Sequence, residues 1–125
     1  MAPRFFARLV SAACLMLFSG CLSPTLPLPP PEPPDTITAE ATPGTWLISG
    51  NCLKGAMVTV FDEDLGKGAV VEDRDLDGRY EVVIQANLCD LGWVEQRVGT
   101  DEAARTTFVI QDRTPSGPLD PLACK

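Results

Sequence analysis

The chain has 125 residues, with 10 Lys and Arg against 17 Asp and Glu, no His, and 45% hydrophobic residues. This length leaves room for one small domain, and the net charge of −7 argues against a surface that binds nucleic acid or anionic lipid headgroups. Without His, the usual general base and a common zinc ligand are missing, so we expect a protein that is not an enzyme.

A short apolar segment opens the chain. Arg4 and Arg8 supply positive charge, residues 9–18 are mainly apolar, and the small residues Ser19 and Gly20 precede Cys21. An apolar stretch of about 10 residues is too short to span a bilayer, which takes about 20, but it has the length of the apolar region of a signal peptide.

Residues 17–21, Leu-Phe-Ser-Gly-Cys, resemble the lipobox of bacterial lipoproteins, which are diacylated on the Cys thiol and cleaved just before it. The resemblance implies a signal peptide over residues 1–20 and a lipid, with palmitate-type acyl chains, on Cys21. Two acyl chains hold a protein stably on a membrane, whereas one does not. Leu22 follows the Cys where inner-membrane lipoproteins tend to have Asp, which resembles the outer-membrane pattern. Ordinary secretory cleavage is the alternative, because Phe18 stands where the family usually has Leu.

Prolines dominate the next segment, which we predict to be a disordered linker over residues 21–43. Such a run favours the polyproline II conformation at about 3.1 Å per residue, so residues 22–42 could hold a domain up to roughly 60 Å from the membrane. The prolines in question are Pro24, Pro27, Pro29, Pro30, Pro31, Pro33 and Pro34.

The segment 44–113 contains no proline and is predicted to be the folded domain. Short runs of β-prone residues, some with strict alternation, are separated by turn residues such as those at 54–55, 65–68 and 87–90. No stretch keeps a helical period for three turns, so six or seven strands in a small all-β sandwich or barrel are expected. The predicted strands are 45–49, 56–61, 68–71, 80–85, 92–98 and 106–111.

Three motifs in this segment resemble bacterial Ig-like domains. They are residues 48–61, with Gly-Ala-Met-Val-Thr-Val at their centre, residues 75–82 around Asp-Gly, and residues 99–108, which precede the last strand. A similar turn occurs in carboxypeptidase regulatory-like modules, and both families are small β-sandwiches. The resemblance covers about residues 44–112 and implies an Ig-like or fibronectin type III-like sandwich that serves as an adhesive or scaffold module.

The alternation of apolar residues also predicts which side chains form the core. Asp77-Gly78 between two alternating runs is typical of a hairpin turn. Trp93 is expected to cap one end of the sandwich. The two inner faces are expected to comprise Trp46, Val58, Val60, Tyr80, Val82, Ile84, Phe108 and Ile110.

The only motif that suggests a binding site is Asp73-Arg-Asp-Leu-Asp-Gly78. Asp73, Asp75 and Asp77 match the first half of an EF-hand loop, in which alternate carboxylates converge on calcium. The bidentate Glu expected at the twelfth place is Ile84, so a plain turn is the other interpretation. The acidic residues at 62–64 and 101–102 would join this loop only if the strand order placed them at the same end.

Five cysteines are present, in a compartment that permits disulfides. Cys14 falls in the signal peptide and Cys21 is the predicted lipid site. We expect Cys52 and Cys89 to form a disulfide, which would close a long loop and stabilise the small core by about 3–4 kcal/mol. Cys124 would then be left over. In the rival pairing, Cys124 fixes the Pro-containing tail, residues 114–125.

Together these patterns predict a non-enzymatic lipoprotein of the bacterial outer membrane, on its periplasmic face or at the cell surface. It would contact the membrane through the lipid on Cys21 and present its domain to an unknown envelope or extracellular protein, or serve a structural or adhesive role. The alternative is a calcium-binding β-sandwich module that uses Asp73, Asp75 and Asp77. No other cofactor and no nucleic-acid partner are expected.

Overall fold

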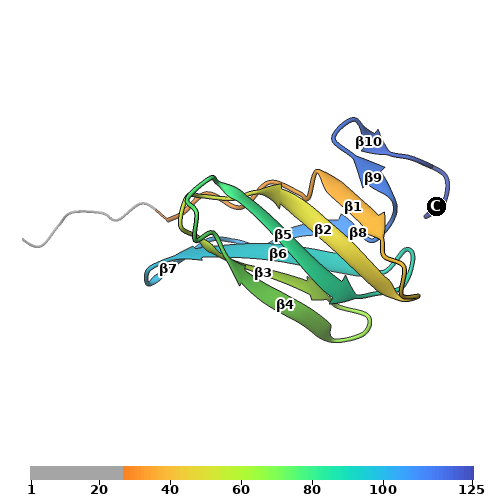
Figure 1. The fold of residues 1–125 in the computed structure, drawn as a ribbon, viewed down its shortest axis with the longest axis horizontal. Coiled ribbons are helices and arrows are strands. Elements are labelled where there is room, and N and C mark those ends of the chain that lie inside the picture. Colours follow the sequence, from red (N-terminus) through yellow and green to blue (C-terminus); the bar gives the residue numbers. More distant parts are fainter. Residues whose placement is uncertain (1–26) are drawn as a thin grey trace, which may run out of the picture.

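A computed structural model describes residues 27–125, and the predicted signal peptide and Cys21 lie outside the described residues. The chain forms an all-β sandwich, as predicted (Figure 1). Seven strands have four or more residues, in agreement with the predicted six or seven, and three more have two residues each. The strands are β1 (Thr36–Ala39), β2 (Thr45–Asn51), β3 (Met57–Asp62), β4 (Lys67–Glu72), β5 (Arg79–Gln85), β6 (Leu91–Val98), β7 (Asp101–Glu102), β8 (Thr106–Val109), β9 (Arg113–Thr114) and β10 (Gly117–Pro118).

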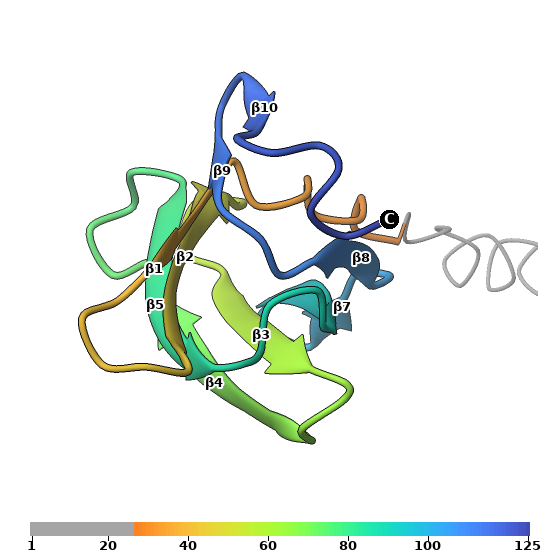
Figure 2. The ribbon, with the colours of Figure 1, turned by 90° about the vertical axis from the view of Figure 1, so that its right-hand side faces the viewer.

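Two antiparallel sheets pack face to face (Figure 2). One has the order β10-β9-β1-β2-β5, and the other has the order β4-β3-β6-β7. β8 also pairs with β6, along the first half of β6, whereas β7 pairs with the last two residues of β6. The chain passes between the sheets from β4 to β5, so the turn at Asp77-Gly78 joins the two layers and is not the hairpin that its sequence predicts.

The strict alternation of buried and more exposed residues along both strands explains the pairing of β2 with β5. Every second residue of β5 is buried, and Trp46, Ile48 and Gly50 of β2 stand opposite Ile84, Val82 and Tyr80, so all six face the core. A side chain at Gly50 would meet the Tyr80 ring, since a Cβ placed there would lie 2.8 Å from the Tyr80 Oη. The register therefore depends on a glycine opposite a large aromatic residue.

The predicted core residues occupy the interior. All are buried except Phe108, which is partly buried and packs against the others, and they are joined by Ile37 from β1 and Val94 from β6.

The prediction that Trp93 caps an end is wrong. Trp93 lies on the outer face of β6, because its neighbour Val94 faces the core. It is 8% exposed there, stacked on Phe61 with ring centroids 5.1 Å apart and covered by the Arg105 guanidinium, 3.8 Å from its ring centroid.

The predicted linker, where the structure describes it from residue 27 onward, is part of the domain, which corrects the boundary at residue 44. Thr36–Ala39 pairs with β2 along its whole length, and Ile37 and Pro34 are fully buried. The reason is that four residues with three β-branched side chains suffice for a strand once a neighbouring strand offers a partner.

The prolines before this strand also pack against the domain. The Gln96 amide donates to the Pro29 carbonyl at 3.0 Å, and the Thr106 hydroxyl donates to the Pro31 carbonyl at 2.5 Å. Proline lacks only the N–H, so its carbonyl can still accept hydrogen bonds from side chains of β6 and β8.

The predicted disulfide Cys52–Cys89 is wrong, because Cys89 pairs with Cys124 and Cys52 is a free thiol. Cys52 follows β2 next to the start of β5, whereas Cys89 follows the end of β5. The length of β5, seven residues at about 3.3 Å each, separates them, which is far beyond the reach of a disulfide. The alternative, in which Cys124 fixes the tail, is confirmed. The tail folds back beside β1, because β9 pairs with β1 and β10 pairs with β9.

Candidate functional site

Each end of the sandwich contains three aspartates whose carboxylate oxygens lie within 4.8 Å of one another. The entry end is where residues 27–35 join the domain, and it holds the loop 73–78. The far end holds the β3–β4 turn, the β5–β6 loop and Cys124, which is bonded to Cys89 of that loop. Figure 1 shows both connections and the C-terminus on the right-hand side of the view. The two groups are therefore separated by the length of the strands.

Asp73, Asp75 and Asp77 converge at the entry end, as the sequence motif predicts. Asp73 is 3% exposed and its two oxygens accept hydrogen bonds from three backbone N–H groups: Gly55 at 3.0 Å, Gly78 at 2.9 Å and Asp77 at 3.3 Å. Asp73 therefore holds the 73–78 loop against the turn that precedes β3.

The electrostatics of this loop fit that structural role. Burial would raise the pKa of the Asp73 carboxyl, but the N–H groups of Gly55 and Gly78 outweigh it and hold the pKa at about 2. The hydrogen bond to Asp73 raises the pKa of Asp75. Because the Asp73 oxygens are already occupied by N–H donors, the plain turn explains this motif better than calcium does, and calcium at this loop stays a prediction.

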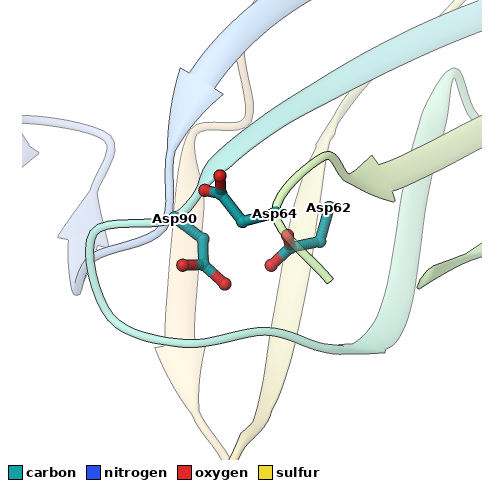
Figure 3. A group of neighbouring side chains, drawn as sticks. All are labelled: Asp62, Asp64 and Asp90. Carbon is teal, nitrogen blue, oxygen red and sulfur yellow. The ribbon is translucent and has the colours of Figure 1, made fainter. Parts of the chain in front are cut away.

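Asp62, Asp64 and Asp90 form the second group, at the far end (Figure 3). One oxygen of each carboxylate is held by a backbone N–H: Asp62 Oδ1 by Leu65 at 2.9 Å, Asp64 Oδ2 by Leu91 at 2.8 Å, and Asp90 Oδ2 by Asn87 at 2.8 Å. These bonds fix the orientation of the three side chains and leave one oxygen of each for another contact.

Asp62 is the unusual member of this group. It is 0% exposed, and its Oδ2 has no hydrogen-bond partner among the described residues. Burial, together with the neighbouring Asp90 carboxyl, raises the pKa of Asp62. Lys67, which is opposite Asp62 in the β3–β4 hairpin, donates to the Gln85 side chain at 2.7 Å and so is held by β5.

The sequence drew attention to residues 62–64 but not to their partner. The structure places Asp62 and Asp64 at the opposite end from Asp73, because residues 67–72 form one strand that runs the length of the sheet. Asp90 joins them since β3 pairs with β6, which brings Asp62 opposite Gly92. Only the pairing of the strands 57–62 and 91–98 could have indicated this group.

A cleft of about 230 Å³ lies at the entry end beside Cys52. Burial and the carboxylates of Asp73 and Asp77 raise the pKa of the Cys52 thiol to about 11, so it is protonated at neutral pH and a poor nucleophile. The lining comprises residues 29–32, Asn51, Leu53 and Gln96. We assign no chemistry to this cleft.

Comparisons with models of protein families, with curated proteins and with solved structures found no match for this chain. Within residues 27–125, no helix has the length and hydropathy needed to cross a membrane.

Proposed function

We propose that this chain is a non-enzymatic bacterial envelope lipoprotein, attached to the outer membrane through Cys21, that presents one Ig-like domain to another envelope or extracellular protein. The observation that carries the proposal is the short connection between Cys21 and Leu28, which forms a β-bridge with Ala103 of the domain. Seven residues span at most about 25 Å, so the anchor would hold the domain close to the bilayer.

This geometry gives the domain an orientation. The entry end would face the membrane, and the far end would face away from it. Arg79 donates to Asp35 through Nη1 and Nη2, at 2.6 and 3.2 Å, and to Asn51 through Nη1 at 2.8 Å, so the entering chain is fixed to β2 and β5. A rigid connection would keep the same end outward in every molecule.

The far end also has the character of a contact surface. Exposed apolar side chains occur in the β3–β4 turn, the β5–β6 loop, the paired residues that end β8 and begin β6, and the tail. Side chains of this kind, between 36 and 70% exposed, favour contact with a protein partner over an entirely solvated role. They are Leu65, Leu88, Leu91, Val109 and Leu122.

Mass spectrometry of the mature protein from bacterial membranes tests the anchor. We expect an N-terminus at Cys21 with the added mass of a diacylglyceryl group, and loss of membrane association in a Cys21→Ser variant. A mature chain that begins elsewhere, or that carries a free Cys21 thiol, would refute the lipoprotein proposal.

Photo-crosslinking in intact cells tests the orientation. A photoreactive residue in place of Leu88 at the far end is expected to form adducts with a protein partner. The same residue in place of Val83, which is 50% exposed on the outer face of β5, is the matched control and is expected to form few. Equal labelling from both positions would contradict presentation of the far end.

A further inference from the structure

We propose that Asp62, Asp64 and Asp90 form a calcium-binding site at the far end of the sandwich. This site is distinct from the calcium motif that the sequence suggests at residues 73–78, and it does not depend on the lipid anchor. The observation that points to a ligand is the Asp62 carboxylate, which is completely buried while its Oδ2 has no hydrogen-bond partner among residues 27–125.

A buried carboxylate oxygen without a donor is costly, because it has lost its water and gained nothing in exchange. Figure 3 shows the Asp62 carboxyl directed toward that of Asp90, whereas the Asp64 carboxyl lies above them in this view and is turned the other way. One oxygen of each of the three still lies within 4.8 Å of the others. All three groups accept hydrogen bonds, so they cannot satisfy one another while ionised. A cation between them would supply the missing partner and remove their mutual repulsion.

The backbone prepares the group for this role. Glu63 donates its N–H to the Leu91 carbonyl at 2.9 Å, while the Leu91 N–H donates to Asp64 at 2.8 Å, so the β3–β4 turn is fixed to the start of β6. The Asp90 carbonyl accepts from Ile110 at 2.9 Å. The three side chains thus come from the end of β3, from the β3–β4 turn and from the β5–β6 loop, and these hydrogen bonds hold the turn to β6 and the loop to the residue after β8. Little further ordering is therefore needed for binding.

The chemistry of the group favours calcium. Calcium takes six to eight oxygen ligands at about 2.3–2.6 Å, so oxygens up to about 5 Å apart can share one ion, and the separations here are at most 4.8 Å. Magnesium demands near-ideal octahedral geometry at about 2.0–2.1 Å and is usually bound through only one or two carboxylates, so a group of three fits calcium better. Asp64 is exposed and Asp90 is partly exposed, which leaves a path for the ion and for water ligands on the outer side.

The test uses the full chain purified in detergent, first treated with a chelator and then titrated with calcium chloride. At about 10 mM calcium we expect the melting temperature to rise by on the order of 10 °C, because a ligand that binds only the folded state stabilises it. Terbium, used as a luminescent substitute, is expected to be sensitised by Trp93, whose neighbour on β6 stands opposite Asp62.

Three single variants localise the ion. Asp62→Asn and Asp64→Asn are expected to abolish both the calcium shift and the terbium signal, and Asp75→Asn at the entry end is the matched control that keeps both. In chelator, Asp62→Asn is expected to melt no lower than the unsubstituted chain, since it loses a buried charge. Asp64→Asn, which alters an exposed side chain, keeps the test valid if Asp62→Asn folds poorly.

Three results would overturn the proposal. The first is an unchanged melting temperature at about 10 mM calcium. The second is a calcium shift that survives in Asp62→Asn and Asp64→Asn but disappears in Asp75→Asn, which would place the ion at the 73–78 loop. The third is an equal shift with magnesium at the same concentration, which would indicate general charge screening.

Discussion

The disulfide between Cys89 and Cys124 makes a quantitative prediction. It joins residues 35 apart in the sequence, and the chain-entropy relation for a loop of that length gives about 4 kcal/mol of stabilisation at 25 °C. The double variant Cys89→Ser/Cys124→Ser should therefore unfold with a free energy about 4 kcal/mol lower. For a domain of this size the melting temperature should fall by on the order of 20 °C.

Urea unfolding under non-reducing conditions measures this difference, with intrinsic Trp fluorescence as the signal. Addition of a thiol reductant should lower the stability of the unsubstituted chain to that of the double variant and should leave the double variant unchanged. Cys52→Ser is the matched control, because it removes a thiol that forms no disulfide, and it should change the stability by less than about 1 kcal/mol.

The reasoning would be refuted by a large loss in Cys52→Ser together with no loss in Cys124→Ser, since that pattern belongs to the pairing Cys52–Cys89. Peptide mapping without reduction gives an independent answer, because only the pairing observed here links the peptide that contains Cys89 to the C-terminal peptide.

Four further predictions concern the entry end and the core. Asp73→Asn should lower the melting temperature far more than Asp75→Asn, because it weakens the acceptor of three backbone N–H groups; equal losses would contradict this role. Since the folded-state pKa of Asp73 is about 2, below its ordinary value of 3.8, its contribution to stability is present above pH 4 and is lost as the pH falls toward 2. Urea unfolding between pH 5 and pH 2.5 should show a smaller decline for Asp73→Asn than for the unsubstituted chain. Cys52, with a pKa of about 11, should react with iodoacetamide slowly at pH 8 and faster as the pH approaches 11, and a fast reaction at pH 7 would refute its protection. Gly50→Ala should cost about 1–3 kcal/mol in urea unfolding through its clash with Tyr80, and an unchanged stability would show that the ring can move.

Local patterns were sufficient for four of the longer strands. β2, β3, β5 and β6 begin and end within two residues of their predicted bounds, because their alternation matches one buried face. The same patterns failed for β1, since a Pro-rich segment reads as a linker until a partner strand is known. Ile37 and Pro34 become core residues only when β2 lies beside them.

Of the two candidate sites, one could be predicted from local sequence and the other could not. Asp73, Asp75 and Asp77 are close in sequence, so the motif alone predicted that they converge. The group of Asp62, Asp64 and Asp90 combines the end of β3, the β3–β4 turn and the β5–β6 loop, and Asp90 reaches it only because β3 pairs with β6. The disulfide is of the same kind, since Cys89 and Cys124 meet only after the tail has returned along β1.

The sequence by itself therefore determined the all-β class, the strands and most of the core, because a period of two residues is a local property that any half-buried strand must have. Only the tertiary structure decided where the domain begins, which cysteines pair and which acidic groups share an end. Those features depend on contacts between residues far apart in the chain, and composition and spacing carry no direct record of them.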